Sequence, residues 1–316
     1  MADNKSIATR DSYGAALLEL ADAGHDDIVV FDADLSASTR TSVFAKKYSE
    51  RFFDCGIAEC NMVGVAAGMS TFGYVPFVSS FAMFAAGRAF EQIRNSIGYP
   101  ELNVKIAATH GGLSVGEDGA SHQCCEDFAL MRPIPGMVVM SPADDVEARA
   151  MVKAAYEYVG PVYIRFGRSA VPVFHEEENY TFQIGKGEVI QDGADVAVIA
   201  NGLLVAEAIE AGRLLAEAGI SARIINMPTI KPLDEELVVK AAKETGAIVT
   251  AENHNVTCGL GSVVSNCLAK NCPTVQEFVG VQDLFGQVGP QDFLMDEYGL
   301  RAANIVAAVK KAISRK

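Results

Sequence analysis

Two histidines and two acidic residues share one glycine-rich segment, residues 109–123, which reads Thr-His-Gly-Gly-Leu-Ser-Val-Gly-Glu-Asp-Gly-Ala-Ser-His-Gln. The chain has five histidines, and His110 and His122 lie here on either side of Glu117 and Asp118. Imidazole and carboxylate groups together transfer protons and bind hydroxyl groups near neutral pH. The many glycines argue against a helix or an ordinary strand, so we expect a loop that carries function.

The segment before this loop has the pattern of a buried strand. Residues 104–109 read Val-Lys-Ile-Ala-Ala-Thr and lead directly into the first histidine. Open α/β sheets bind their ligands beyond the carboxyl ends of their strands. This position favours a functional site, and the alternative is a surface loop whose aspartate only caps the chain.

A second candidate for chemistry is Glu59. It lies in Gly-Ile-Ala-Glu-Cys-Asn-Met-Val-Gly, residues 56–64, a segment that follows a strand pattern and opens a helix. The helix dipole favours a carboxylate at that end. Its small, apolar neighbours leave it poorly solvated, which suits proton exchange or a bond to a ligand N–H. On spacing alone, an ordinary first-turn glutamate is an equally good interpretation.

Aromatic and charged residues flank these two segments. Phe81 and Phe84 lie three positions apart on one helical face, which fits core packing or a slot for a flat heterocycle. The acidic loop 32–38 follows the first strand pattern and suits a ligand wall. Arg10 and Arg168 suit a phosphate, because a guanidinium donates two hydrogen bonds at once. A surface ion pair is at least as good an interpretation of each arginine.

Length and composition limit the class of protein. A chain of 316 residues that is 50% hydrophobic can bury the cores of about two domains. Its net charge of −14 argues against a nucleic-acid partner, because phosphates are repelled. No apolar run approaches the roughly 20 residues that cross a bilayer, and the first residues lack the apolar region of a signal peptide. The seven cysteines form no C-x-x-C pair and fit reduced thiols. We therefore expect a cytoplasmic protein without membrane contact.

Several common signatures are missing from the sequence. We find no Walker-type loop, no G-x-S-x-G turn and no G-x-G-x-x-G opening a helix after the first strand. No dense set of metal ligands is present either. The sequence therefore predicts no metal site built by this chain alone.

Strand and helix patterns alternate along the chain. The expected strands are 27–32, 51–55, 75–79, 104–109, 137–141 and 161–165, and the helices are 11–23, 60–71, 81–97 and 145–159, the last with Asp144 or Asp145 as N-cap. Residues 171–192 interrupt this rhythm with Pro172 and an acidic run. It resumes with strands near 195–200, 222–227, 246–252 and 274–279 and helices near 203–218, 234–245, 261–271 and 301–314. The pattern predicts an α/β protein with a mostly parallel, doubly wound sheet and a smaller α/β domain.

Taken in order, these segments resemble the transketolase family. The matching stretches are Ser-Ile-Ala-Thr-Arg10, Phe-Asp-Ala-Asp34-Leu35, Gly-Ile-Ala-Glu59, Ser-Phe81-Ala-Met-Phe84, Thr-His110, Gly-Glu-Asp118-Gly-Ala-Ser-His122-Gln and Arg-Phe-Gly-Arg168. Their order and spacing are specific, although no single stretch is. The resemblance spans nearly the whole chain but only the second half of a full-length transketolase. It implies a pyrimidine-binding domain (1–170), a connection (171–192) and a transketolase C-terminal domain (193–316).

The resemblance implies thiamine diphosphate as the cofactor. Glu59 matches the glutamate that bonds N1′ of the aminopyrimidine and thereby helps to deprotonate the thiazolium. Phe81 and Phe84 match the aromatic wall around the pyrimidine. Asp34 and Leu35 match positions close to the cofactor, with Leu35 beside the thiazolium.

The resemblance also implies how sugar phosphate substrates are bound. Asp118 matches the aspartate that recognises a sugar hydroxyl, and His122 matches a histidine that contacts hydroxyls of donor and acceptor, so His122 and His110 join Glu59 as catalytic candidates. A ring of four residues is implied to hold the sugar phosphate: Arg10, Ser38, His110 and Arg168.

Two positions depart from the family pattern. Many members have Arg-Glu-His where this chain has Ala58-Glu59-Cys60, so the local hydrogen bonds must differ. Gly87 stands one helical turn after Phe84, where single-chain members tend to carry another aromatic residue. Stand-alone half-length chains look similar at both places.

The diphosphate-binding half of the family's site is missing. The Gly-Asp-Gly…Asn signature that holds the metal and the diphosphate does not occur in this chain. We therefore expect a separate N-terminal transketolase subunit that holds Mg²⁺ or Ca²⁺ and the diphosphate, most simply in an α₂β₂ assembly in which this chain also dimerises.

The favoured interpretation is the C-terminal subunit of a split transketolase, which moves a two-carbon ketol unit between sugar phosphates. The pathway is left open between the pentose phosphate route and specialised sugar catabolism. Two enzymatic alternatives are the β subunit of a 2-oxoacid dehydrogenase E1 and a 1-deoxyxylulose-5-phosphate synthase-like enzyme. A regulatory scaffold without activity is the non-enzymatic alternative.

Overall fold

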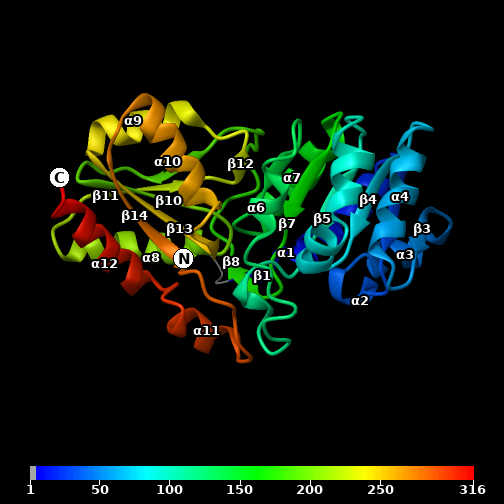
Figure 1. Ribbon diagram of the computed structural model, residues 1–316, viewed down its shortest axis with the longest axis horizontal. Coiled ribbons are helices and arrows are strands. Elements are labelled where there is room, and N and C mark those ends of the chain that lie inside the picture. Colours follow the sequence, from blue (N-terminus) through cyan, green and yellow to red (C-terminus); the bar gives the residue numbers. More distant parts are fainter. Residues whose placement is uncertain (1–4) are drawn as a thin grey trace.

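Two α/β units lie side by side along the long axis of the molecule (Figure 1). The computed structural model describes residues 5–316, so residues 1–4 of the predicted first domain lie outside the described part. The first unit is built on a seven-stranded sheet and the second on a five-stranded sheet. Both sheets are mostly parallel and carry helices on both faces, which confirms the predicted fold class.

The first sheet has the strand order β12-β6-β7-β5-β4-β2-β3. Six of its strands run parallel: β2 (Ile28–Asp32), β3 (Phe52–Asp54), β4 (Val75–Ser79), β5 (Lys105–Ala108), β6 (Val138–Met140) and β7 (Val162–Arg165). The edge strand β12 (Thr229–Lys231) runs antiparallel to β6 and comes from the second half of the chain. The two halves of the sequence are therefore joined by a strand as well as by the connecting segment.

Helices cover this sheet on both faces because successive strand residues point to opposite sides. Ile28 and Val30 of β2 pack in the core beneath α1 (Thr9–Asp22) and α7 (Asp145–Glu157). Val29 and Phe31 pack in the opposite core, against α4 (Glu59–Ser70) and residues 83–98. The shorter helices of this unit are α2 (Ser36–Thr39), α3 (Ser42–Lys47) and α6 (Asp127–Met131).

One predicted helix is interrupted and one predicted cap is present. Residues 81–97 form a π-helix at Met83–Arg88, the short α5 (Phe90–Gln92) and a second π-helix at Ile93–Gly98. The backbone N–H of Ala89 donates to the carbonyl of Phe84 five residues earlier, so the turn is wider than an α-turn. Asp144 is the N-cap of α7, where its carboxylate accepts from the backbone N–H of Glu147.

The second sheet has the order β14-β13-β10-β11-β9 and lies between two helix pairs. Its strands are β9 (Glu188–Gln191), β10 (Val196–Ala200), β11 (Ala222–Asn226), β13 (Ala247–Asn255) and β14 (Val275–Val281). Its helices are α8 (Leu204–Glu217), α9 (Glu235–Thr245), α10 (Leu260–Asn271), α11 (Gln291–Glu297) and α12 (Ala302–Ile313). α8 and α12 pack on one face, and α9 and α10 on the other.

The segment between the two units is tied to both. It begins at β8 (Ala170–Pro172), which pairs antiparallel with β1 (Ser6–Ala8) at the start of the chain. It ends with β9, which pairs antiparallel with β11 in the second sheet. The residues between these strands carry His175, whose ring lies between two carboxylates.

His175 forms a buried charged cluster with the start of α7. Its Nδ1 lies 3.0 Å from Asp144 Oδ1, and its Nε2 lies 2.8 Å from Glu188 Oε2. Burial opposes the charge on the ring, but bonds to Asp144 and Glu188 outweigh that cost and raise the pKa of His175 to about 9. The cluster therefore ties the connecting segment to both α7 and β9.

We expect the substitution His175→Gln to lower the free energy of unfolding by about 1–3 kcal/mol at pH 7. The folded pKa lies above the ordinary 6.5, so the stabilisation is complete below pH 6.5 and disappears as the pH rises through about 9. Urea unfolding at pH 7.5 and 10 measures it, and the difference between variant and wild type should shrink at pH 10. A constant difference would contradict the charged pair, and His25→Gln is the control.

Candidate active site

Most predicted site residues lie on segments that leave the carboxyl edge of the first sheet, the edge at which open α/β sheets bind ligands. They follow β2 (Asp34, Leu35 and Ser38), β3 (Glu59), β4 (Phe81 and Phe84), β5 (His110, Asp118 and His122) and β7 (Arg168). Arg10 reaches the same edge from the first turn of α1. The sheet thus gathers residues from all parts of the first unit.

Glu59 is the first residue of α4 and is only 1% exposed. Both of its carboxylate oxygens accept from Nη1 of Arg88, at 2.8 and 2.9 Å. The side chain of Arg88 is 49% exposed, so the ion pair joins a buried anion to a cation at the surface. Sequence reasoning missed Arg88, whose only local signal is its position four residues after Phe84.

Aromatic rings form a continuous wall beside this carboxylate. The ring of Phe81 stacks on that of His110 with centroids 3.8 Å apart, and it also faces Phe84 at 5.9 Å. His122 meets Phe84 edge-on at 5.2 Å. The guanidinium of Arg88 lies over the Phe84 ring, with Cζ 4.7 Å from the centroid. The predicted aromatic pair therefore links the Glu59 end of the site to the histidine loop.

Hydrogen bonds fix the orientation of the His110 ring. Nη1 of Arg10 contacts Nε2 of His110 at 3.1 Å and donates to the carbonyl of Ser38, also at 3.1 Å. A guanidinium can only donate, so Nε2 must accept and the proton belongs on Nδ1. Nδ1 then donates to Thr109 Oγ1 at 2.8 Å. His110 has a φ of +60°, a strained conformation for a side-chain-bearing residue at a functional site.

Three arginines act electrostatically on His110. Burial and then the nearby charges of Arg10, Arg168 and Arg40 lower the pKa of His110 to about 3, so the ring is neutral at physiological pH. Burial, followed by the charge of Arg40, also lowers the pKa of Arg10. Arg40 also pairs with Asp11, and Arg168 pairs with Glu117 at 3.2 Å, the ion pair that was the alternative interpretation of Arg168. The arginines still outnumber these carboxylates, so this part of the edge suits an anionic group in a protein whose net charge is −14.

The loop after β2 is held by Asp32, the first residue of the acidic loop 32–38 that the sequence predicts as a ligand wall. Its carboxylate accepts from the backbone N–H of Leu35 at 2.7 Å and from the hydroxyls of Thr39 at 2.6 Å and Thr41 at 2.8 Å. Burial raises the pKa of Asp32 to about 6 in spite of these bonds. Asp32 thereby fixes the backbone on which Leu35 and Ser38 stand.

The histidine loop is anchored from the domain junction by Arg165, the last residue of β7. Its Nη2 donates to the carbonyls of Cys124 and Asn253, both at 2.9 Å, and its Nε lies 3.1 Å from Asp127. A Cβ at Gly111 would lie 1.9 Å from Nε of Arg165, so only glycine fits at this position of the loop. Asn253 belongs to β13, and this contact therefore fixes the loop to the second unit.

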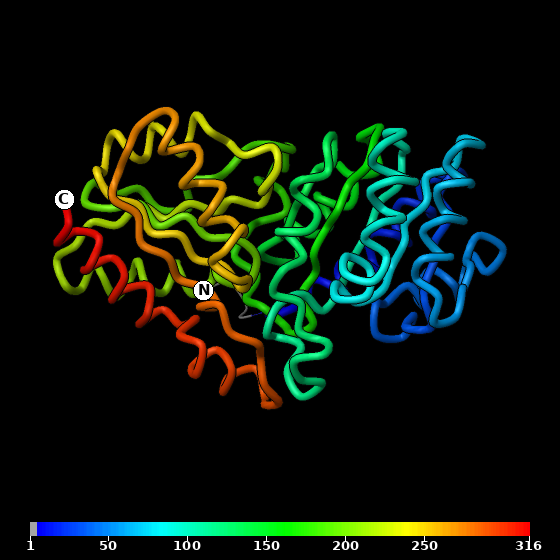
Figure 2. The backbone as a smooth tube through the Cα atoms, in the orientation of Figure 1, coloured from blue at the N-terminus to red at the C-terminus, as the bar shows by residue number. Residues whose placement is uncertain are grey.

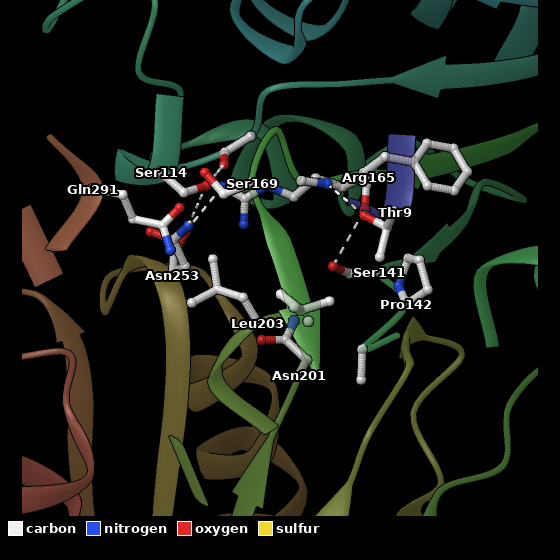
Figure 3. Close-up of a pocket in the computed structure, with 16 residues that line it drawn as sticks. Thr9, Ser114, Ser141, Pro142, Arg165, Ser169, Asn201, Leu203, Asn253 and Gln291 are labelled. Carbon is white, nitrogen blue, oxygen red and sulfur yellow. Dashed lines mark hydrogen bonds between the residues drawn. The ribbon is translucent and has the colours of Figure 1, made fainter. Parts of the chain in front are cut away.

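A small cavity with polar and apolar lining residues lies beside this anchor, between the two units. Figure 3 shows side chains of both units around it, among them Ser141, Asn201 and Asn253. Its volume of about 30 Å³ is enough for a water molecule but not for a sugar phosphate. The cavity therefore belongs to the contact between the two units, and none of the catalytic candidates lines it.

The outer part of the loop carries Asp118 and His122. Asp118 is exposed, and His122 is half-buried with its Nδ1 2.9 Å from Ser121 Oγ. Gln123 donates to the carbonyls of Gly116, at 3.1 Å, and Gln287, at 3.0 Å. The backbone trace shows this loop beside the segment before α11 (Figure 2). The second unit thus supports the loop along one side.

The described residues contain neither a membrane-spanning helix nor a cluster of metal ligands. Within residues 5–316, no helix has both the length and the apolar character needed to span a membrane. The same residues contain no group of three or more His, Cys, Asp or Glu side chains that could hold a metal ion.

Comparisons with known proteins identify the two units. Residues 5–173 match the model of the transketolase pyrimidine-binding domain, and residues 185–305 match that of the transketolase C-terminal domain. The chain belongs to the transketolase family. In domain content it corresponds to the C-terminal section of a transketolase.

The similar proteins include half-length chains. A putative transketolase C-terminal section from Methanocaldococcus jannaschii is 48% identical over 97% of this chain and 96% of its own length. A 6-deoxy-6-sulfo-D-fructose transketolase subunit from Clostridium sp. is 43% identical over 97% of this chain and 95% of its own. A solved split-gene transketolase, described as an inactive β4 tetramer, is 54% identical, with a TM-score of 0.91 over 98% of this chain and 99% of that chain.

We expect His110 of this transketolase chain to remain neutral from pH 8 down to about pH 4.5, because burial and the nearby arginines lower its pKa to about 3. NMR of the ¹⁵N-histidine-labelled chain measures this, with His110→Gln to assign the signal. Nδ1 should also carry the proton. Titration of His110 near pH 6.5 would contradict the arrangement of Arg10 around the ring.

Proposed function

We propose that this chain is the C-terminal subunit of a two-chain, thiamine diphosphate-dependent transketolase. The enzyme would transfer a two-carbon ketol unit from a ketose phosphate to an aldose phosphate. The observation that carries the proposal is a continuous row of contacting side chains, with a buried carboxylate at one end and an arginine cluster at the other. Glu59 and Phe84 mark the first end, and Arg10, His110 and Arg168 mark the second.

The residues at the carboxylate end fit the cofactor's flat, N–H-donating pyrimidine ring. Glu59 is a buried acceptor, and Phe84 offers an aromatic face beside it. When bound, thiamine diphosphate supplies the carbon that carries the two-carbon unit between sugars. Glu59 would hold the ring through a hydrogen bond and move a proton to or from it. Phe81 would complete the apolar wall, and Leu35 and Asp34 would approach the cofactor from the loop fixed by Asp32.

The arginine end fits a sugar that carries an anionic group. Neutral His110 accepts from Arg10 through Nε2, so it orients that guanidinium toward the anion without adding charge. Arg168 would add a second guanidinium for the anion, and Asp118 and His122 would bind sugar hydroxyls on the exposed side.

Similar proteins are a 6-deoxy-6-sulfo-D-fructose transketolase subunit and an apulose-4-phosphate transketolase subunit. Their substrate names share an anionic group, which suits the arginine cluster, and we place this chain in carbohydrate metabolism, either in the pentose phosphate pathway or in specialised sugar catabolism.

The surface around Glu59 supports a partner chain. Ile57 and Phe72, at the two ends of α4, are 77% and 82% exposed. A Cβ built at Gly64 or Gly68 meets nothing within 4 Å, so these small residues do not serve packing within the chain. An apolar surface with small residues that let another chain approach closely is typical of an interface.

We propose that the N-terminal subunit covers this surface, holds the diphosphate through Mg²⁺, and forms an α₂β₂ enzyme with this chain in the cytoplasm. The inactive β4 tetramer of a similar chain supports this requirement for a partner.

We expect Glu59→Gln to lower kcat of the reconstituted two-chain enzyme by two to four orders of magnitude, about the usual size of an acid–base contribution. The assay follows ketol transfer from xylulose 5-phosphate to ribose 5-phosphate, with this chain alone and mixed with the N-terminal chain. Glu91→Gln removes an exposed glutamate and is the matched control. Unchanged turnover in Glu59→Gln would rule out the proposed role and favour a scaffold function.

We expect Arg10→Met to raise KM for the phosphorylated acceptor by roughly 10- to 100-fold, the effect of losing one charge-assisted hydrogen bond. The variant should act on glycolaldehyde, which has no phosphate, nearly as well as the wild type. Steady-state kinetics with both acceptors separate the two effects. Arg94→Met removes an exposed arginine and is the control. Equal losses with both acceptors would place Arg10 outside the anion site.

A further inference from the structure

Arg88 makes two contacts at once, and both involve proposed cofactor-binding residues. Its Nη1 donates to both oxygens of Glu59, and its guanidinium lies over Phe84, with Cζ 4.7 Å from the ring centroid. A guanidinium is planar, cationic and rich in N–H donors, and it stacks on aromatic faces. Arg88 thus occupies a carboxylate and an aromatic face with a flat, N–H-donating group.

The proposed cofactor ring needs those same two contacts. An aminopyrimidine is also flat, donates a proton toward a carboxylate and packs against an aromatic wall. The Glu59 side chain is 2% exposed whereas that of Arg88 is 49% exposed, so Arg88 covers the carboxylate on its solvent side. The two groups cannot occupy one place, and one of them must leave.

We propose that Arg88 is a placeholder for the cofactor's aminopyrimidine in the chain without cofactor. In this state it neutralises and covers Glu59, and it must swing away when the ring binds. The inference rests on the proposed function, because it assumes that Glu59 and Phe84 receive thiamine diphosphate. It adds a residue that controls cofactor binding and that family resemblance did not assign.

Physical chemistry gives a reason for such a placeholder. A buried carboxylate without a partner is costly, and Glu59 in a half-length chain lacks the remainder of its site until the other subunit arrives. Arg88 supplies the missing positive charge from within the chain. The side chain of Arg88 is half-exposed, so it borders solvent on the side away from Glu59.

The placeholder should weaken cofactor binding by a predictable factor. If the Arg88–Glu59 pair is formed in nine-tenths of the molecules, only about one-tenth is competent to bind the ring, and the apparent Kd rises about tenfold. Arg88→Met should remove this competition. Arg88→Lys keeps the positive charge but loses the planar guanidinium that lies over Phe84, and it should give an intermediate Kd.

The experiment has two parts, and the first needs no cofactor. Thermal unfolding of the isolated chain is measured for wild type, Arg88→Met, Glu59→Gln and the double variant. A pair formed in the free chain predicts that the two single substitutions are not additive. Arg94→Met, on the same segment but away from Glu59, should behave like the wild type in both parts.

The second part measures thiamine diphosphate binding to the reconstituted two-chain complex by calorimetry, in the presence of Mg²⁺. We expect Arg88→Met to bind about tenfold more tightly, with kcat at saturating cofactor within about twofold of wild type. Weaker or unchanged binding, or a large loss of kcat at saturation, would show that Arg88 stays in the site, and additive unfolding shifts would show that the pair is not formed. Either result overturns the placeholder alone. Absence of binding to the wild-type complex would overturn the proposed function as well.

Discussion

The buried guanidinium of Arg165 is the contact on which the geometry of the site depends. It lies in the last position of β7 and is bound on three sides, by Asp127, by the carbonyl of Cys124 and by that of Asn253. A buried guanidinium is stable only when it is paired, and removing one partner of a buried ion pair costs about 3–5 kcal/mol. It therefore fixes the histidine loop, the short helix α6 and the second unit in one arrangement.

The candidate site uses burial in opposite ways at its two ends. Around His110, burial and three arginines keep an imidazole neutral so that it accepts from Arg10. Around Glu59, burial leaves a carboxylate with a single cationic partner, Arg88. The His110 end therefore suits an anion, as a sugar phosphate would provide. The Glu59 end presents a carboxylate to a cation or an N–H donor, as the proposed cofactor ring would provide.

Much of the fold followed from the sequence because its patterns are local. The apolar runs that predicted strands 27–32 and 75–79 became β2 and β4, since continuous apolar residues are stable only when both faces of a parallel sheet are covered. Asp144 capped α7 because its carboxylate needs only a backbone N–H three residues away. The prediction of a regular α-helix over 81–97 was wrong, because this segment contains two π-helices that its composition does not indicate.

The sequence by itself determined the two α/β units, the family and the identity of most candidate residues, because strand ends and short motifs are encoded next to one another in the chain. Only the tertiary structure decided the partners of those residues. Arg88 meets Glu59 from 29 positions away, and Arg10 meets His110 from 100 positions away. Such pairs form because parallel strands bring their carboxyl ends to one edge of the sheet. The pattern of residue types along the sequence does not indicate which side chains will face each other at that edge.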